Sequence, residues 1–375
     1  MNRAGILVCV LFGVVALSAV ALLALQSMRY ESSPDTSAAR DVAQSNDKGA
    51  ADDPPIVKTP AFVIERPLPD ADALPEFSAT GAHLLIYDVQ HDATTPDSPR
   101  YLRQAFKILN EAGARALGQY TVEYDPSFQT VEINHVAVIR DGVREDRRDQ
   151  IDTMVAQRET MAELQILTGF KTVIMTLSDL RVGDILDIAV TVRGRHPSFD
   201  AKDAFAAPLI FGSDVAQFSL RSRWPGTVQH NAQRFTDRLA ATVTSEKGET
   251  LIEIPPQAVE AISFTDADDL LQSYGFESTL IASNFGSWAS VATWGKQLFA
   301  PATTDALTAV AADIRRSFEA PEERAIAALR FTQDEIRYAA RIINDGGYRP
   351  QPVQQTLETR VGDCKAKVLL LLSLL

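Results

Sequence analysis

Alternating apolar and polar positions run through the middle of the chain. Between about residues 60 and 265, several stretches place an apolar residue at every second position, which puts alternate side chains on one face of a strand. The clearest are residues 119–124, 129–140, 172–177, 184–192 and 218–223. Asp141-Gly142 is typical of a hairpin turn, and Lys247-Gly248 separates two further apolar stretches. Seven or more short strands predict an antiparallel β-sandwich domain over residues 60–265, rather than alternating strands and helices.

The apolar spacing becomes helical after Ile262, so residues 266–300 are predicted to be a helical connector. A helix is predicted to begin after Thr303 or Thr304, either of which is a suitable cap. A second helix is predicted from Pro321 to the Asn344–Gly347 stop. Its buried stripe is predicted to comprise Ile326, Leu329, Ile336, Ala340 and Ile343.

The N-terminus carries 22 residues without a charge, from Ala4 to Leu25, between Arg3 and Arg29. A helix of this length crosses about 30 Å of hydrocarbon, so residues 1–30 are predicted to hold a signal anchor that is a transmembrane helix. A cleaved secretory signal and a buried core helix are the alternatives. Residues 31–59 are rich in Ser, Ala, Asp and Pro and predict a disordered linker. We therefore expect a single-pass protein of the inner membrane with most of the chain in the periplasm.

Composition narrows the possible functions. The 375 residues include 36 Lys and Arg against 49 Asp and Glu, a formal charge of −13, which argues against nucleic-acid binding. Cys9 and Cys364 are the two cysteines, too few for a disulfide framework or a cysteine-rich zinc site. The five histidines lack the close spacing of paired metal ligands, so neither a metal nor a cofactor is predicted.

The β-rich region carries no constellation of residues that indicates catalysis. His135 is predicted to share a strand face with Val131, Ile133 and Ala137. This pattern favours a partly buried histidine with a hydrogen-bond partner over a ligand or a general base.

Cys364 is the residue with the clearest chemical potential. Asp363 is predicted to cap a helix that places Cys364 in its first turn. The positive end of the helix dipole, with Lys365 and Lys367 nearby, favours the nucleophilic thiolate over the thiol. The alternative is a small buried residue without chemistry. A lone thiol in an exported protein is at risk of oxidation, which favours a functional role.

Several short motifs carry a resemblance to known families. The segments are Gln333 to Tyr338, Gly346-Gly347-Tyr348-Arg349-Pro350, Leu357-Glu358 and Arg360-Val361-Gly362-Asp363-Cys364-Lys365. They resemble the nucleophile region of the transglutaminase-like superfamily. Residues 182–187 and Arg195-His196-Pro197 resemble the domain of unknown function 3857, which precedes such cores in bacterial envelope proteins. Together the resemblance covers residues 82–375.

The resemblance implies that Cys364 is the nucleophile of a Cys, His, Asp triad, and that residues 301–375 form the N-terminal part of a papain-like core. Acyl transfer, or hydrolysis of a protein or peptide amide through a thioester, would follow. In that family the His and Asp lie downstream of the cysteine, whereas here all five histidines precede Cys364. The apolar residues 368–375 predict a helix that needs covering layers. We therefore expect a chain truncated just after the nucleophile and inactive as it stands. The alternative is a non-catalytic envelope binding or scaffold module built on the β-sandwich.

Overall fold

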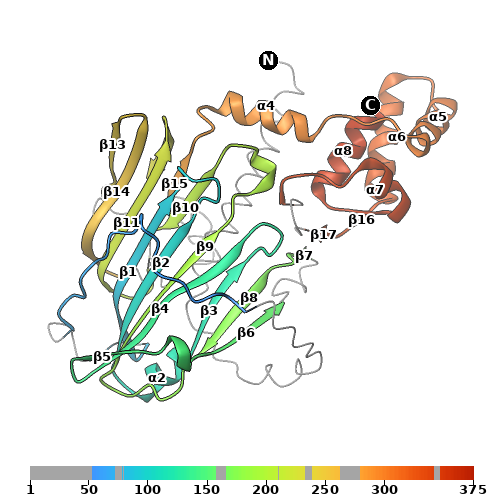
Figure 1. The fold of residues 1–375 in the computed structure, drawn as a ribbon. Helices are drawn as coiled ribbons and strands as arrows, with labels where there is room; N and C mark the ends of the chain where they lie inside the picture. The colour runs from blue at the N-terminus through green and yellow to red at the C-terminus, as the bar shows by residue number, and fades with distance from the viewer. Residues whose placement is uncertain are drawn as a thin grey trace.

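The computed structural model describes residues 53–71, 78, 80–157, 166–209, 211–232, 239–261, 279–341 and 347–375. The predicted anchor at residues 4–25 and most of the predicted linker lie outside these ranges. Within them, no helix has both the length and the apolar character needed to cross a membrane. The described part has an α+β fold in which a β-rich region is followed by helices (Figure 1).

The β-rich region is built on one sheet of eight strands, in the order β13-β14-β11-β1-β2-β9-β4-β5. The strands are β1 (Ala82–Asp92), β2 (Arg100–Ile108), β4 (Thr130–Arg140), β5 (Val143–Asp146), β9 (Ile185–Arg193), β11 (Val215–Pro225), β13 (Thr242–Glu246) and β14 (Glu249–Val259). Neighbouring strands run antiparallel except β1 and β11, which are parallel. The large sheet is therefore mixed, whereas the sequence predicted only antiparallel pairing.

Two of its hairpins have the predicted turns. Asp141 and Gly142, between β4 and β5, have φ values of 52° and 78°. Lys247 and Gly248, between β13 and β14, have φ values of 52° and 82°. A positive φ at both central positions matches the right-handed twist of the flanking strands, which is why a glycine is needed there.

Two smaller sheets share a hydrophobic core with the large one. They are formed by β3 (Gln119–Tyr124), β8 (Lys171–Thr176) and β6 (Asp152–Gln157), and by β10 (Ala204–Pro208), β15 (Thr279–Ser283) and β12 (Gln229–Ala232). Ile188 of the large sheet, Met175 of β8 and Leu280 of β15 are all fully buried in this core. This layering is the sandwich-like arrangement expected from the alternating pattern.

The connector differs from its prediction. Residues 266–300 were predicted to be helical, and within the described part of that range β15 is a strand of the core. Helix α4 (Trp288–Leu298) follows it, with Ser287 and Ser290 forming a capping box. Leu280 and Ala282 are fully buried while Ile281 and Ser283 between and after them are partly exposed, the period of two that is typical of a strand.

A β-bulge overturns the predicted placement of His135. Val131 and Ile133 point into the core, but the β4–β9 register shifts between Ile133 and His135. Val136 then takes the core position, because the bulge's extra residue reverses which side chains face inward. His135 lies on the opposite face of the sheet, where its Nε2 is 2.9 Å from an oxygen of Asp187.

The helical region contains α5 (Asp305–Ser317), α6 (Pro321–Asp334), α7 (Val353–Thr359) and α8 (Cys364–Leu374). Thr304 caps α5 by accepting a hydrogen bond from the amide of Leu307, as predicted. Helix α6 ends well before the predicted Asn344, because its continuation pairs as strands. β16 (Arg337–Tyr338) pairs with β18 (Val361–Gly362), and β17 (Ala340–Arg341) pairs with β7 (Ile166–Leu167).

The predicted buried stripe of that second helix is wrong for Ile326 and Leu329, whereas Ile336 and Ala340 are buried but lie beyond the helix, Ala340 in β17. Ile326 and Leu329 are 51% and 41% exposed, and Ile343 lies outside the described residues. Ile336, at 1% exposure, does lie in the helical core, but it follows the helix and precedes β16. In α8, Leu369 and Leu370 are buried while Leu372 is 39% exposed, so burial is one-sided rather than all round.

Candidate functional site around Cys364

Cys364 is the first residue of α8, as the sequence predicted. Asp363 has an extended backbone and caps the helix, its carboxylate accepting a hydrogen bond of 2.8 Å from the amide of Ala366. The side chain of Cys364 is exposed to solvent. The sulfur is therefore accessible to a substrate at the N-terminal end of a helix.

Tyr338 contacts Cys364 through a pairing that the sequence does not reveal. In the short parallel sheet, Tyr338 lies opposite Gly362, two residues before the cysteine. Its hydroxyl is hydrogen-bonded to the Cys364 side chain. Burial, and after it the neighbouring Cys364 and Asp363, raises the pKa of Tyr338. Sequence reasoning assigned no role to this residue, although it ends the quoted Gln333 to Tyr338 segment.

Gly362 allows β18 to approach α8 closely. A Cβ at this position would lie 3.0 Å from the Cβ of Ala366 and 3.3 Å from Cγ2 of Thr356, which is tighter than ordinary van der Waals contact. The hydrophobic core beneath comprises Leu307, Ile336, Val353, Leu357, Leu369 and Leu370. These contacts fix the position of the first turn of α8, and hence of Cys364.

The two lysines beside Cys364 have other partners. Lys365 is buried and forms an ion pair with Asp363. Lys367 donates to the backbone carbonyl of Ile336 at 2.7 Å and to that of Gln333 at 3.3 Å. The two lysines that the sequence predicted to act on the thiol are therefore bound to other groups, whereas the helix N-terminus and Tyr338 lie beside Cys364.

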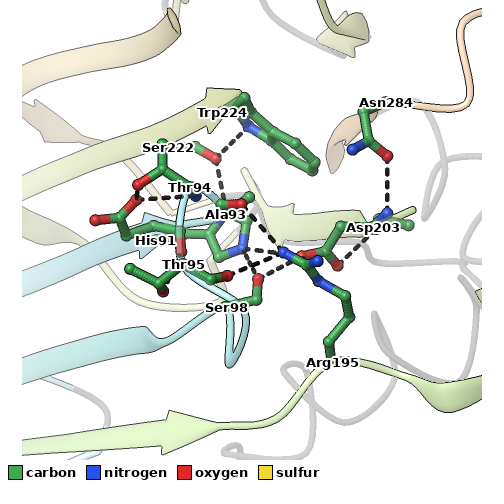
Figure 2. A network of polar contacts seen from close by, with 12 residues as sticks. His91, Ala93, Thr94, Thr95, Ser98, Arg195, Asp203, Ser222, Trp224 and Asn284 are labelled. Carbon is green, nitrogen blue, oxygen red and sulfur yellow. Dashed lines mark hydrogen bonds and ion pairs between the residues drawn. The ribbon is translucent and has the colours of Figure 1, made fainter. Parts of the chain in front are cut away.

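A second group of polar residues lies inside the β-rich region around His91 (Figure 2). Ser98 donates its proton to Asp203, so Ser98 Oγ accepts from the protonated Nε2 of His91 at 2.8 Å. Because the imidazole is neutral, its other nitrogen, Nδ1, accepts from Ser222 Oγ at 2.8 Å. Trp224 in turn donates its indole proton to Ser222 Oγ at 2.7 Å.

This arrangement is not that of a serine nucleophile. Ser98 is 7% exposed and gives its proton to a carboxylate instead of a histidine. Burial, with Arg100 and Arg195 nearby, lowers the pKa of His91 well below its usual value, so the imidazole is neutral. The polar groups of this network are buried and hydrogen-bonded to one another, which is typical of a structural role.

The same network leads to an aromatic cluster at the junction with the helices. The Nη2 group of Arg195 donates to the carbonyls of Ala93 and Thr95 at 3.1 and 3.0 Å, which fixes the segment that begins at His196. The cluster comprises Phe128, His196, Phe199, Phe285, Trp294 and Tyr348. Trp294 of α4 donates its indole proton to the carbonyl of Ser198 at 2.6 Å. Through this cluster α4 and the segment before α7 contact the β-rich region.

The structure brings Cys364, Asp363 and Tyr338 together. Among the contacts of the described residues, those of His91 and His135 lie within the β-rich region, and His196 packs against Tyr348. None of these contacts joins a histidine to Cys364. The described ranges also contain no group of three or more His, Cys, Asp or Glu side chains positioned to hold a metal ion.

Comparison with known families gives a match to the β-rich region. Residues 97–255 match the family described as a domain of unknown function with a solved structure, DUF3857. The match covers most of the large sheet together with β3, β6, β8, β10 and β12, and it confirms the DUF3857 resemblance of the β-rich region. It ends before the helical region that holds Cys364.

Solved structures show similarity over a longer stretch. A candidate protease from Parabacteroides distasonis is 14% identical, with a TM-score of 0.60 over 79% of this chain and 59% of its own. At this identity the likeness shows the fold alone, and the chain spans little more than half of that structure. Aminopeptidase A of Legionella pneumophila (9% identity, TM-score 0.30, 56% of this chain and 22% of its own) and an M1 zinc metallopeptidase of Deinococcus radiodurans (12%, 0.26, 54% and 42%) are too distant to support an argument. A comparison with curated proteins found no match.

Proposed function

We propose that the chain is the nucleophile-bearing part of a transglutaminase-like thiol enzyme that acts on protein or peptide amides. The observation that carries the proposal is the exposed Cys364 at a capped helix N-terminus, with the Tyr338 side chain beside it. The resemblance of residues 333–365 to the nucleophile region of that superfamily supports it. The fold likeness to a candidate protease agrees with a peptidase-like role.

In the proposed reaction the Cys364 thiolate attacks the amide carbonyl and forms a thioester, while the amine leaves with a proton from a general acid. Water then gives hydrolysis, or a second amine gives acyl transfer. Tyr338 stabilises the thiolate before attack by donating its proton to sulfur. The His and Asp that the resemblance implies are not among residues 365–375.

We also propose an envelope location. The uncharged residues 4–25 would anchor the chain in the inner membrane, and residues 31–59 would hold the folded part in the periplasm. Fractionation of cells should place the protein in the membrane pellet, and protease added to spheroplasts should digest the body. Recovery in the soluble cytoplasmic fraction would contradict the proposal.

The test of the nucleophile is the alkylation rate of Cys364. Iodoacetamide at pH 7 should modify Cys364 in the folded chain several times faster than a free peptide of residues 360–367, with mass spectrometry reporting the modified peptide. Tyr338→Phe should slow the reaction several-fold, because the thiolate loses a hydrogen-bond donor.

Thr304→Ala is the matched control for this experiment. It removes a helix cap at α5, remote in sequence from Cys364, and should leave the alkylation rate unchanged. Equal rates for the folded chain, the Tyr338→Phe variant and the free peptide would contradict the assignment of Cys364 as an activated nucleophile.

A further inference from the structure

Residues 53–71, here called the strap, cross the face of the large sheet opposite the shared core (Figure 1). The strap first pairs with β4, where Val57 donates to the carbonyl of Ile133 and Ile133 donates to that of Pro55. It then reaches β11 and runs over β1. A single extended segment therefore contacts strands from one side of the sheet to the other.

The side-chain amide of Gln90 binds the backbone of Ile64 at two points. The amide N–H of Ile64 donates to Oε1 of Gln90 at 2.9 Å, and Nε2 of Gln90 donates to the carbonyl of Ile64 at 2.7 Å. Gln90 has no exposed surface, and its amide is held in orientation by a second hydrogen bond of 2.7 Å to Asp88. This is the pairing that a neighbouring strand would make, supplied here by a side chain.

Other side chains of this face also bind main-chain groups of the strap. Arg103 donates to the carbonyl of Arg66 at 2.6 Å, and Arg221 to that of Phe62 at 3.2 Å. Gln217 donates to the carbonyl of Pro67 at 3.4 Å. In contrast, the side chain of Ile64 points outward, and the residue is 44% exposed. Around Ile64 the face therefore recognises the backbone of the strap, while further along Leu68 and Ala71 also pack their side chains on Leu85, Ile86 and Ala105.

Apart from a turn in which the amide of Val63 donates to the carbonyl of Pro60, the strap is extended, which suits it to this recognition. Pro54, Pro55, Pro60, Pro67 and Pro69 fix φ near the polyproline value. Most of its backbone carbonyls are thus available to the sheet rather than used in a helix. If the strap left, buried Gln90 and Arg103 would lose partners, and each unsatisfied buried group is unfavourable. Another extended polypeptide on the vacated face would restore these hydrogen bonds.

We propose that this face, formed by Gln90, Arg103, Gln217 and Arg221, is a binding site for extended, proline-containing polypeptide segments. The strap occupies it within the folded chain, and a segment of another polypeptide binds by displacing the strap. Recognition is through the main chain, so it tolerates many side chains. The site is separate from Cys364 and does not depend on the proposed chemistry there.

The test uses a fluorescent peptide of residues 53–71 and the full chain, with binding followed by anisotropy. Ile64→Pro in the chain removes the amide that donates to Gln90 and weakens its own strap, so the peptide should bind at least tenfold more tightly than to the wild type. Ile64→Ala keeps that amide and is the matched control, expected to behave as the wild type. Adding Gln90→Ala to Ile64→Pro should abolish the gain.

Two altered peptides separate main-chain from side-chain recognition. A peptide N-methylated at Ile64 should lose at least tenfold in affinity for the Ile64→Pro chain, whereas a peptide with Ile64→Ala should bind nearly as well as the parent. Equal binding of the N-methylated peptide, or no gain in a folded Ile64→Pro chain, would overturn the proposal.

If the Ile64→Pro variant does not fold, a photo-reactive peptide on the wild-type chain gives the test. It should crosslink to β1, β2 or β11, and crosslinks elsewhere or none would overturn the proposal.

Discussion

Arg103 binds the buried carboxylate of Asp187 at two points, with Nε to Oδ1 and Nη2 to Oδ2 both at 2.9 Å. The same carboxylate is 2.9 Å from Nε2 of His135 and 2.6 Å from Nη1 of Arg144. Asp187 has no exposed surface, so its charge is balanced entirely by these side chains on the strap side of the sheet. One carboxylate thus joins four strands of the large sheet, β2, β4, β5 and β9.

Replacement of Asp187 by Asn should strongly destabilise the protein. The substitution leaves the buried guanidinium of Arg103 without its counter-charge, and breaking a buried pair in this way destabilises by about 3–5 kcal/mol. Urea unfolding followed by circular dichroism measures the change. Asp179→Asn is the control, because Asp179 pairs with Arg140 and Arg181 while 46% exposed, and its loss should change stability by less than about 1 kcal/mol. If the two substitutions lowered the free energy of unfolding equally, Asp187 would not be the charge on which its buried partners depend.

The stability of the protein should fall in acid because of the same residue. Burial alone would raise the pKa of Asp187, but His135 and Arg103 lower it well below its usual range. A carboxyl with a lower pKa in the folded state stabilises the protein fully above its unfolded pKa of about 4, and this contribution is lost as the pH falls below that value. The unfolding free energy of the wild type should therefore decline between about pH 4 and pH 2, and more steeply than that of Asp187→Asn. Parallel pH profiles would contradict this origin of the acid sensitivity.

Two glycine substitutions should differ sharply in effect. Gly142 in the β4–β5 turn has a positive φ but open space where a Cβ would lie, so Gly142→Ala should destabilise by about 1 kcal/mol. Gly194 has a φ of 139°, and a Cβ there would overlap the backbone carbonyl of Phe128. Gly194→Ala should destabilise by several times as much, or prevent folding. Thermal unfolding of the two variants gives the comparison, and similar midpoints would show that the backbone at Gly194 can move aside.

Trp294 should hold α4 against the β-rich region. Trp294→Phe keeps the aromatic packing but removes the donor to the carbonyl of Ser198, which should destabilise by about 1 kcal/mol. Limited proteolysis should then cleave sooner near α4. Trp288→Phe is the control, because Trp288 lies on the same helix at 79% exposure and should change stability by less than about 0.5 kcal/mol. If the two variants had the same stability and the same cleavage rate, the hydrogen bond of Trp294 would not be what holds α4 against the β-rich region.

The tight turns and the helix caps were predictable from the sequence. The Asp141-Gly142 and Lys247-Gly248 turns, the Thr304 cap and the Asp363 cap depend on residues within a few positions of one another, and the structure has all four. The position of Cys364 at the start of a helix followed from the same short-range signals. These features are set by backbone geometry and nearby hydrogen bonds, which a sequence displays directly.

The burial of α8 and the partners of its charges were not predictable in this way. An apolar run suggested a helix covered on every side, yet Leu372 is 39% exposed while Leu370 is fully buried. Lys365 was expected to favour the thiolate, but it pairs with Asp363. Which side chain a charge meets depends on the packing of neighbouring elements, and a pattern of residue types does not contain that information.

The sequence by itself determined the alternating strands, their tight turns, the helix caps and the place of Cys364, because each depends on contacts between near neighbours along the chain. Only the tertiary structure decided the end of α6, the parallel pairing of β1 with β11, the face on which His135 lies and the contact of Tyr338 with Cys364. These features join residues far apart in sequence, such as Tyr338 and Gly362 or Leu84 and Val215. Their energies come from long-range pairing and burial, which override local propensity when the two conflict.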